Sequence, residues 1–490
     1  GGGGRGGGRW DDGRGRGNEP WQGVDGSDDF EANLEQDEAA FRKEFGAAFS
    51  SGIEFSKYAD IPVEIDLPHG CAELPEGMQP VKEFAGLKCG RVIGRNLKFA
   101  GFTVPTPVQG NSVPIAIGGW DVVSIAQTGS GKTLAFMLPI LYRLLEQGPS
   151  QPSGGRGRGR PPVAIRALAL APTRELAQQI HEESKKFAFR CGLRICCAYG
   201  GSPFGEQMRE LERGCDVLVA TPGRLDDMIG RDRVTLSQCT FLVLDEADRM
   251  LDMGFEPQMR KIVSQIRPDR QTLMWSATWP KEVEGMARDF LTNFYQVTVG
   301  SLELAANKSI TQMVEVVDDN DKYRRCIGFM REHFKGERVI VFVETKRGAD
   351  QLTRSIRQEG YPANAIHGDK TQDERDRTLQ DFRDGRIMIL IATDVAARGL
   401  DVKNVQMVVN FDMPNNAEDY VHRIGRCGRA GATGTSMSYF TRKNARMGRD
   451  LVKLLRDAGQ EVPRDLEQMA MSGGGGGGGG RYAGGGRGRY

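Results

Sequence analysis

The chain has 490 residues, 39% of them hydrophobic and 27% charged, and its formal net charge at pH 7 is +1. This length predicts roughly two to four domains, and the near-neutral charge excludes a strong overall positive field that would attract nucleic acid. The sequence has no long apolar run and starts with Gly and Arg, so we expect neither a membrane span nor a secretory signal. Its nine cysteines include no CxxC pair, which argues against a zinc site or a disulfide scaffold.

Both ends of the chain have low complexity. Residues 1–55 begin with arginines set among glycines and then turn acidic, with too few large apolar residues to offset the entropy cost of ordering. Residues 463–490 include a run of glycines, Gly473–Gly480, followed by arginines and tyrosines. We predict that both ends are disordered. The last segment suits contact with RNA or protein partners through charge and stacking, and the alternative is a solubilising tail without a partner.

Short β-branched runs alternate with helical patterns over residues 80–297 and again over 310–462. This rhythm predicts an α/β fold with two lobes, each a parallel sheet covered by helices on both faces. Residues 298–309 lack a strong period and are predicted to be the linker between the lobes. The runs predicted to be strands include Asp121–Ala126, Ala167–Ala171, Asp216–Ala220, Phe241–Asp245 and Thr272–Ser276, and in the second lobe Arg338–Val343, Ile387–Thr393 and Val405–Phe411.

A glycine-rich turn, Ala126–Thr133, follows the first of these strands and precedes a helical pattern. That context is typical of a phosphate-binding loop, although Ala126 stands where the general pattern has glycine. Backbone N–H groups would face the phosphates, Lys132 would supply a positive charge, and Thr133 would offer a hydroxyl to Mg²⁺. A Gly-rich turn without a ligand is the alternative. The residues predicted to surround the nucleotide here are Thr128, Gly129, Ser130, Gly131, Lys132 and Thr133.

The apolar run that starts at Phe241 ends in two carboxylates, Asp245 and Glu246. Asp245 could hold Mg²⁺ directly or through water, and Glu246 could polarise the water that attacks the γ-phosphate. Strand ends often carry Asp because it forms turns, so this pattern alone is weak evidence for a catalytic site. Its position downstream of the phosphate-binding loop in the same lobe favours a nucleotide hydrolase.

Four motifs in this order resemble the DEAD-box ATP-dependent RNA helicases of superfamily 2. They are Ala126–Thr133, the DEAD sequence Asp245–Asp248, Ser276–Thr278 and His422–Arg429. The resemblance implies two RecA-like lobes, the use of ATP and Mg²⁺, and RNA-stimulated ATP hydrolysis. The implied function is local unwinding of short RNA duplexes or remodelling of RNA–protein complexes. An ATP-gated RNA clamp or scaffold is one alternative, and a P-loop ATPase that acts on DNA or protein is another.

The same resemblance implies further residues around the nucleotide. Gly101–Gln109 is similar to the Q motif of that family, in which Phe102 would stack on adenine and Gln109 would hydrogen bond to its edge. Asp401 would reach the ribose. Ser276 and Thr278 would act in coupling, with hydroxyls that bridge the DEAD carboxylates and the closed interface between the lobes.

The last motif implies a contribution from the second lobe to hydrolysis. His422, Arg426 and Arg429 would complete the catalytic site, because arginines that reach a γ-phosphate stabilise the charge of the transition state. Cys427 stands where the family usually has threonine, and a redox-sensitive thiol is a minor alternative for it.

Residues at the ends of several predicted strands resemble the motifs that line the RNA path in this family. Any one of them alone could be a helix cap or a surface arginine. RNA, single-stranded or in a short duplex, would bind through phosphates and 2′-hydroxyls, without sequence preference. The implied RNA-binding residues are Pro172, Thr173, Arg174, Gly201, Thr221, Pro222, Gly223 and Arg224, and in the second lobe Thr345, Gly368, Arg375 and Thr393.

Two segments give different indications of the subgroup. Gly52–Glu64 is similar to the segment upstream of the core in Belle- and Vasa-type helicases, whereas Gln271–Trp279 resembles a broader group that includes nuclear RNA-processing helicases. We favour the Belle/Vasa type because the first segment lies outside the shared core. The resemblance also implies a monomeric core, protein partners that bind the tails, no membrane contact, and an intracellular location in cytoplasm, nucleus or RNP granules.

Overall fold

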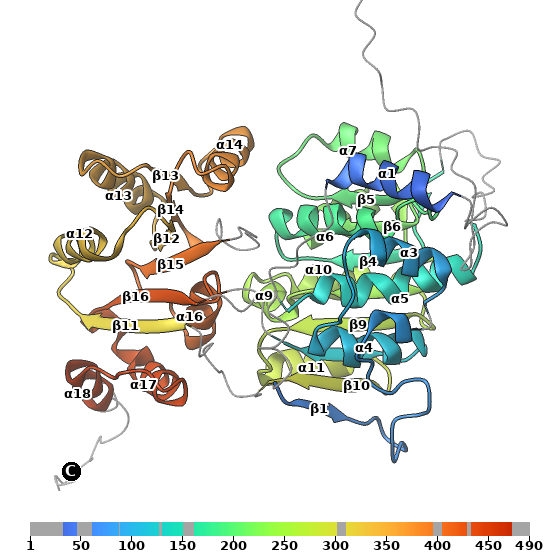
Figure 1. Ribbon diagram of the computed structural model, residues 1–490, viewed down its shortest axis with the longest axis horizontal. Coiled ribbons are helices and arrows are strands. Elements are labelled where there is room, and N and C mark those ends of the chain that lie inside the picture. The colour runs from blue at the N-terminus through green and yellow to red at the C-terminus, as the bar shows by residue number, and fades with distance from the viewer. Residues whose placement is uncertain are drawn as a thin grey trace, which may run out of the picture. The chain divides into compact units, whose positions relative to one another are not determined.

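The computed structural model describes residues 33–46, 61–87, 89–126, 130–149, 161–300, 310–394, 404–428 and 433–472, apart from the side chains of Gln372 and Ser472. The chain divides into two compact units near residue 302. Each unit contains a largely or wholly parallel sheet with helices packed against it (Figure 1). The predicted α/β fold with two parallel-sheet lobes is therefore confirmed.

The sheet of the first unit has the strand order β1-β10-β2-β9-β8-β4-β6-β5. Only β1 runs antiparallel to its neighbour in this sheet, and every other pair is parallel. The strands are β1 (Val63–Asp66), β2 (Val122–Ile125), β4 (Ala167–Leu170), β5 (Ile195–Ala198), β6 (Val217–Ala220), β8 (Phe241–Leu244), β9 (Gln271–Ser276) and β10 (Tyr295–Val299), with β3 (Val163–Ala164) and β7 (Val234–Thr235) forming a separate small parallel pair.

Helices connect these strands and cover both faces of the sheet. They are α1 (Leu34–Phe45), the 3₁₀ turn η1 (Phe84–Gly86), α3 (Arg91–Phe99), α4 (Pro107–Ile117), α5 (Lys132–Glu146), α6 (Arg174–Phe187), α7 (Phe204–Leu211), α8 (Pro222–Gly230), α9 (Ala247–Asp252), α10 (Glu256–Val263) and α11 (Lys281–Phe290).

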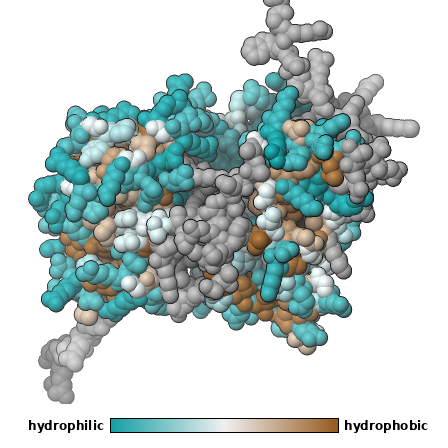
Figure 2. All heavy atoms as spheres, in the orientation of Figure 1, coloured by the Kyte–Doolittle hydropathy of each residue, from teal (hydrophilic) through white to brown (hydrophobic). Residues whose placement is uncertain are grey.

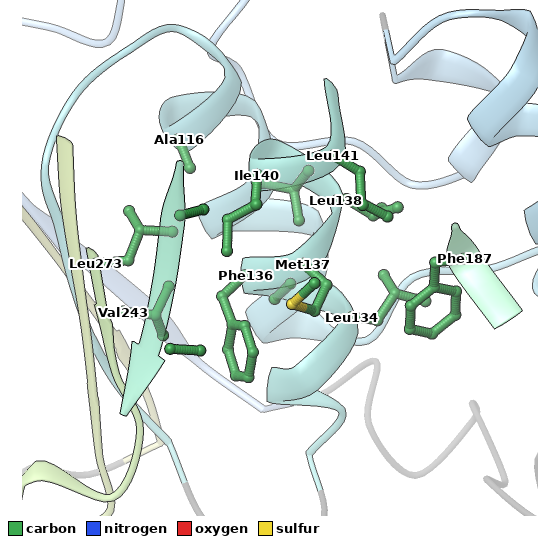
Figure 3. Packing of buried hydrophobic residues seen from close by; sticks show 14 of the residues in the cluster. Ala116, Leu134, Phe136, Met137, Leu138, Ile140, Leu141, Phe187, Val243 and Leu273 are labelled. Atoms are coloured by element: carbon green, nitrogen blue, oxygen red, sulfur yellow. The ribbon is translucent and has the colours of Figure 1, made fainter. Parts of the chain in front are cut away.

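Two hydrophobic clusters fill the first unit, one on each face of its sheet. Successive side chains of a strand point to opposite faces, so Val122 of β2 belongs to one cluster and Val123 to the other. Helix α5 lies inside the first cluster, and Phe136, Met137 and Ile140 are fully buried there (Figure 3). This burial holds the start of α5, which follows the predicted phosphate-binding loop, in a fixed place on the sheet.

The second unit contains a six-stranded, entirely parallel sheet in the order β11-β16-β15-β12-β14-β13. A separate hydrophobic cluster that includes Val339, Ile389 and Tyr439 packs against it. The strands are β11 (Ile310–Val316), β12 (Arg338–Phe342), β13 (Ala363–Ile366), β14 (Ile389–Ala392), β15 (Val405–Asn410) and β16 (Gly434–Phe440); the helices are α12 (Lys322–His333), α13 (Lys346–Gln358), α14 (Gln372–Arg383), α16 (Ala417–Ile424), the 3₁₀ turn η3 (Arg442–Met447), α17 (Gly448–Asp457) and α18 (Arg464–Ser472).

The predicted boundaries of the disordered ends are wrong where helices form. Helix α1 lies within residues 1–55, and its Phe41 is buried against Phe99 and Phe189. Helix α18 lies within residues 463–490, where Leu466 and Ala470 are buried. In both segments a single helix with few apolar residues is stabilised by packing on the rest of its unit, which the composition of the whole segment does not reveal. The remaining parts of both predicted tails lie outside the described residues.

The predicted lobe boundaries also need correction. Strand β1 belongs to the first sheet although it lies upstream of residue 80, the predicted start of the lobe. Strand β10 extends to Val299, so the predicted linker 298–309 begins inside the sheet, and its residues 301–309 lie outside the described part. Helix α18 extends the second unit beyond residue 462.

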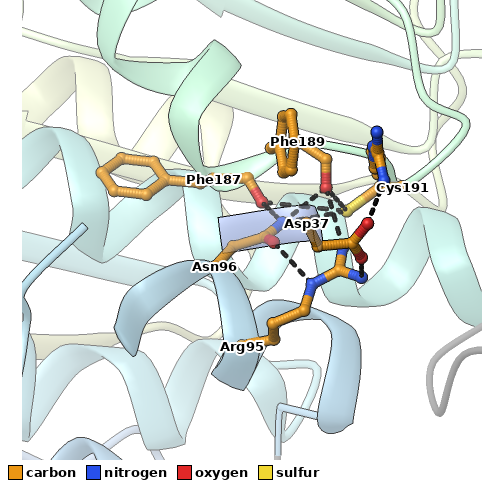
Figure 4. A network of polar contacts seen from close by, with 7 residues as sticks. Asp37, Arg95, Asn96, Phe187, Phe189 and Cys191 are labelled. Atoms are coloured by element: carbon orange, nitrogen blue, oxygen red, sulfur yellow. Dashed lines mark hydrogen bonds and ion pairs between the residues drawn. The ribbon is translucent and has the colours of Figure 1, made fainter. Parts of the chain in front are cut away.

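Helix α1 is held to the first unit by a buried polar network (Figure 4). Asp37 accepts a hydrogen bond of 2.6 Å from Nη1 of Arg95, and these side chains are 4% and 3% exposed. Arg190 pairs with the other carboxylate oxygen of Asp37. Asn96 donates to the carbonyls of Phe187 and Phe189, both at 2.8 Å, at the C-terminal end of α6. The carboxylate of Asp37 therefore has these arginine partners only when α1 is docked on the first unit.

Asp37→Asn should release α1 and lower the free energy of unfolding by about 3 kcal/mol, because it leaves Arg95 buried without its counter-charge. Hydrogen exchange of α1 and urea denaturation would measure the two effects. Glu38→Gln is the matched control, since Glu38 pairs with Arg42 on the exposed face of the same helix and should cost less than about 1 kcal/mol. Equal effects of the two substitutions would contradict the role of the buried pair.

Hydrophilic side chains predominate on the face of the molecule in Figure 2. Among the described residues, no helix has both the length and the apolar character needed to span a bilayer. All nine cysteines are free thiols, and every one except Cys71 is buried. No group of three or more His, Cys, Asp or Glu side chains within the described ranges could by itself hold a metal ion.

Candidate functional site

The strand order places the nucleotide motifs next to one another. In parallel strands the C-terminal ends share one edge of the sheet, where ligands bind in folds of this kind. The glycine-rich turn follows β2, Ser276 ends β9, and Asp245 follows β8, and these three strands are adjacent in the order β2-β9-β8. Motifs separated by up to about 150 residues in the sequence therefore meet at one edge.

Lys132 is the first residue of α5 and lies buried at this edge. Gly131 precedes it with φ +86°, a left-handed conformation that favours glycine. Nζ of Lys132 donates to the carbonyl of Ser276 at 3.2 Å. Burial lowers the pKa of Lys132, and the nearby carboxylates, Asp245 first, oppose that shift. Ser130 and Thr133 are buried beside it, whereas Thr128 and Gly129 lie outside the described residues.

The carboxylates that follow β8 are both buried. Burial, and then the charge of Glu246, raise the pKa of Asp245 to about 7, while Lys132 acts in the opposite direction. Glu246 has φ +53°, a strained backbone conformation for a residue with a side chain, and its Oε2 is buried with no hydrogen-bond partner. A buried carboxylate oxygen without a donor is costly, so the geometry indicates a place for a water, a cation or another ligand.

The last carboxylate of the DEAD sequence forms the link to Ser276–Thr278. Oδ2 of Asp248 accepts hydrogen bonds from N and Oγ1 of Thr278, both at 2.9 Å, and from N of Ala277 at 3.1 Å. Ser276 contributes its carbonyl, which accepts from Lys132 and from N of Ala126, while its hydroxyl is buried without a partner. Thr278 therefore bonds to a DEAD carboxylate and Ser276 does so with neither its carbonyl nor its hydroxyl among the described contacts, and the coupling role of the two residues stays a prediction. Asp248 was not singled out from the sequence.

Gln109 binds the phosphate-binding turn directly. Its Nε2 donates to the carbonyl of Gly131 at 2.9 Å, and its Oε1 accepts from N of Thr106 at 2.9 Å in a capping box at the start of α4. Oγ1 of Thr106 donates to the carbonyl of Ser130 at 2.7 Å. The amide keeps one more N–H and one more lone pair, so adenine recognition by Gln109 stays a prediction. Phe102 packs edge-on against Phe84 and Phe187, and its stacking on adenine stays a prediction too.

The site fits a hard divalent cation. Thr133 and Asp245, the predicted Mg²⁺ residues, supply hydroxyl and carboxylate oxygens, the donors that Mg²⁺ prefers. The buried, unpartnered oxygen of Glu246 is a third acceptor at the same edge. A cation bound there would lower the cost of three buried carboxylates.

Asp245→Asn should stabilise the ligand-free protein although it removes a site residue. The raised pKa of Asp245 means that the folded state binds more protons than the unfolded state between about pH 4 and 7, so stability falls as the pH rises through that window. The substitution removes this penalty, and we expect a gain of about 2 kcal/mol at pH 8 and little gain at pH 4. Thermal unfolding at both pH values checks this. Asp269→Asn, at an exposed ion pair with Arg267, should give no gain at pH 8.

The predicted RNA-binding residues of the first unit follow three adjacent strands, in the order β4-β6-β5. Thr173 caps α6 by accepting a hydrogen bond from N of Leu176, and the guanidinium of Arg174 lies 4.5 Å from the centre of the Tyr199 ring. Gly201 has φ +79°. Pro172 follows β4, and Thr221, Pro222, Gly223 and Arg224 lie at the start of α8, after β6.

Arg224 has hydrogen-bond partners within the first unit, and its RNA-binding role stays a prediction. Its Nη1 donates to Oε1 of Gln207 at 2.8 Å and its Nη2 to the carbonyl of Ser202 at 2.9 Å. The half-buried guanidinium therefore supports the turn after β5 as well as offering charge at the edge. Sequence reasoning did not identify Gln207.

The second unit repeats this arrangement on the adjacent strands β12-β14-β13. Thr345 follows β12 and caps α13, accepting a hydrogen bond from N of Gly348 at 3.0 Å. Thr393 follows β14 and is buried, Gly368 follows β13, and Arg375 lies half-buried in the first turn of α14. The predicted RNA-binding residues of this unit therefore also share one sheet edge.

Arg423, in α16, is held by an ion pair and by a ring contact. Its Nε and Nη2 donate to the two carboxylate oxygens of Asp394, each at 2.6 Å, and its guanidinium lies 4.9 Å from the ring centre of Phe342. Phe342 therefore packs beneath an arginine. His422 and Arg426 are 4% and 5% exposed. Their predicted catalytic roles stay predictions, and Arg429 and Asp401 lie outside the described residues.

Cys427 is buried and its thiol donates to the carbonyl of Ile424 at 3.1 Å. Redox sensing needs an exposed thiolate, so the structure gives no support to the minor alternative of a redox-sensitive thiol at this position.

Comparisons with known proteins agree with this geometry. The DEAD/DEAH box helicase family model matches residues 106–286, and the helicase conserved C-terminal domain matches residues 321–431. The DEAD-box ATP-dependent RNA helicase 30 of Arabidopsis thaliana is 53% identical over 416 residues, which are 84% of this chain and 69% of that protein. The ATP-dependent RNA helicase DBP2 of Chaetomium thermophilum is 51% identical over 84% of this chain and 72% of its own length.

Solved structures give the same result. Dbp5 of Saccharomyces cerevisiae bound to RNA and ADP BeF3 matches with a TM-score of 0.66 and 28% identity, over 80% of this chain and 99% of that one. None of the relatives named here carries a Belle or Vasa name, so the subgroup stays a prediction. The matched residues include all the motifs gathered at the two sheet edges, and the chain belongs to the family of DEAD-box ATP-dependent RNA helicases.

Proposed function

We propose that this helicase separates short RNA duplexes, or remodels RNA–protein complexes, by binding RNA and ATP along the edges described above. The observation that carries the proposal is the strand order β2-β9-β8-β4-β6-β5 of the first unit. The first three strands end in the residues of the nucleotide site, and the next three end in the predicted RNA-binding residues. Both ligands would therefore contact one continuous edge, so that each one can affect the binding of the other.

At the nucleotide end, Lys132 would move from the carbonyl of Ser276 to the β- and γ-phosphates, a small displacement for a side chain that is already buried at the site. Asp245 and Thr133 would hold Mg²⁺, directly or through water, and the cation would neutralise developing charge on the phosphates. Glu246 would orient the attacking water through the oxygen that has no partner in the ligand-free protein.

At the RNA end, the turns after β4, β5 and β6 would offer hydroxyl, backbone N–H and guanidinium groups to phosphates. These groups carry no information about base identity, which supports binding without sequence preference. The residues of the second unit, Thr345, Gly368, Arg375 and Thr393, would contact the same RNA. His422, Arg426 and Arg429 would assist hydrolysis when RNA and ATP bring the two units together.

An ATP-gated RNA clamp or scaffold remains the second candidate, and steady-state kinetics separate them. We expect single-stranded RNA to stimulate ATP hydrolysis at least about tenfold, and matched DNA to stimulate it little, because the 2′-hydroxyl distinguishes the two. A short RNA duplex should be unwound in the same assay. Stimulation of hydrolysis without unwinding would favour the clamp, and equal stimulation by DNA would contradict RNA recognition.

We also propose that the Gly/Arg segment after α18 adds loose RNA contact, and that both chain ends bind protein partners. Replacing Arg481, Arg487 and Arg489 with Gln should lower the slope of log affinity against log salt by about 2, because each phosphate contact on a single strand contributes about 0.7. An unchanged slope would leave a solubilising role for this segment.

We also propose that the protein is located inside the cell, and imaging of a fluorescent fusion checks this location.

A further inference from the structure

Gln207, in α7, joins two of the turns at the RNA-binding edge. Its side chain is buried, with 6% of the residue exposed. Oε1 accepts hydrogen bonds from Nη1 of Arg224 at 2.8 Å and from N of Tyr199 at 3.4 Å, and Nε2 donates to the carbonyl of Tyr199 at 3.1 Å. One amide therefore holds the arginine that follows β6 and both backbone groups of the residue that follows β5.

The partners of Gln207 extend this network across all three strand ends. Arg224 also donates to the carbonyl of Ser202, beyond the paired glycines Gly200 and Gly201. The ring of Tyr199 lies 4.5 Å from the guanidinium of Arg174, which follows β4. Its hydroxyl accepts a hydrogen bond from Nε2 of Gln178 in α6 at 3.0 Å. The guanidiniums at the edge therefore lie on a common scaffold of partly buried hydrogen bonds.

The chemistry of this position suits an amide. Arg224 needs an acceptor and the carbonyl of Tyr199 needs a donor, and Gln207 supplies the two from separate atoms of one uncharged side chain. A carboxylate could pair with Arg224 but could not donate to Tyr199, and an apolar side chain would take this partner from Nη1 of Arg224 and from the carbonyl of Tyr199, which are both partly buried. Asn is shorter by one methylene and could not reach both.

We propose that Gln207 is a positioning residue for RNA binding, which acts by holding Arg224 and the turn Tyr199–Gly201 in the arrangement that receives phosphates. This inference rests on the RNA path of the proposed function. Arg224 and the turn are prepared before RNA arrives, so RNA does not have to order them. Gln207 need not touch RNA, and its contribution appears in RNA affinity and not in the chemistry of ATP.

Gln207→Met keeps the length of the side chain and removes its hydrogen bonds. We expect the Kd for a fluorescein-labelled single-stranded RNA, measured by anisotropy with the full chain and a non-hydrolysable ATP analogue, to rise about tenfold. The kcat for ATP hydrolysis at saturating RNA should stay within about twofold of the unmodified chain, because the nucleotide site is intact. Gln265→Met is the matched control: Gln265 is exposed, follows α10 in the same unit, and its side chain donates to the carbonyl of Lys261.

A double-mutant cycle with Arg224→Ala distinguishes a positioning role from a general loss of stability. Because Gln207 acts partly through Arg224 and partly through the turn, the loss of RNA affinity in the double variant should be clearly smaller than the product of the two single-variant fold-losses. Fully additive losses, or unchanged RNA binding by Gln207→Met, would overturn the inference. Unchanged binding by Arg224→Ala would instead overturn the RNA path itself. Should Gln207→Met not fold, Gln207→Asn replaces it in the same cycle.

Discussion

Lys132→Ala is expected to lower the kcat for ATP hydrolysis at least about a thousandfold while the fold persists. The ammonium lies buried near the carboxylates Asp245, Asp248 and Glu246, and at this edge it would supply the positive charge that meets the phosphates. The fold should persist because the backbone of α5 is held by its buried apolar residues and not by this charge. Steady-state assays of phosphate release measure kcat, and circular dichroism shows whether the fold is kept.

Lys281→Ala is the matched control for this substitution. Lys281 is also the first residue of a helix, α11, but it is exposed. Its replacement should leave kcat within about twofold of the unmodified protein. Near-normal hydrolysis by Lys132→Ala would show that the glycine-rich turn does not bind the phosphates that react.

Glu246→Gln is expected to bind ATP and RNA together but to release RNA slowly, because hydrolysis falls by about 10²–10⁴-fold. The amide has nearly the shape of the carboxylate, so the strained backbone and the packing around it are kept. What is lost is the ability to accept a proton from water. Loss of this negative charge also removes one of the causes that raise the pKa of Asp245, so Mg²⁺ and ATP should bind at lower pH than in the unmodified protein.

RNA release after a chase with unlabelled RNA gives the measurement for Glu246→Gln. Glu256→Gln, at the exposed start of α10, is its control and should release RNA at the normal rate. Release from Glu246→Gln as fast as from the control would mean that Glu246 does not position the water.

Much of the fold could be predicted from local patterns. Mostly apolar runs such as Phe241–Leu244 and Val405–Asn410 identified central strands, because a strand buried on both faces is rich in apolar residues. Strands without such a run were harder to predict. The edge strand β1 has a half-buried alternation, and β16, which lies inside its sheet, carries Ser and Thr among its residues.

The candidate site was predicted where its residues lie in compact motifs, and missed where they act through distant partners. Lys132, Asp245 and Glu246 could be assigned because each stands at a strand end beside its motif. Asp248 and Arg423 lie inside such motifs and Gln207 lies outside them, but the contacts of all three are made with residues at least eight positions away in the chain. No local pattern predicts which partner such a side chain has. The same reason explains why the docking of α1 was not predicted. In the sequence, Asp37 is one of several acidic residues in an acidic segment, and only the structure shows its buried ion pair.

The burial of the cysteines makes this chain convenient for fluorescence spectroscopy. Burial raises the thiol pKa at Cys89, to about 11, and at Cys239 and Cys326, to about 12, so these thiols react slowly with maleimides near neutral pH. Cys71 is the one thiol that is not buried, and it lies near Tyr295 at the β1–β10 side of the first sheet. A single dye can therefore be attached to the natural sequence there, far along the sheet from the turns after β4, β6 and β5, and the labelled chain can be followed one molecule at a time as it works on RNA.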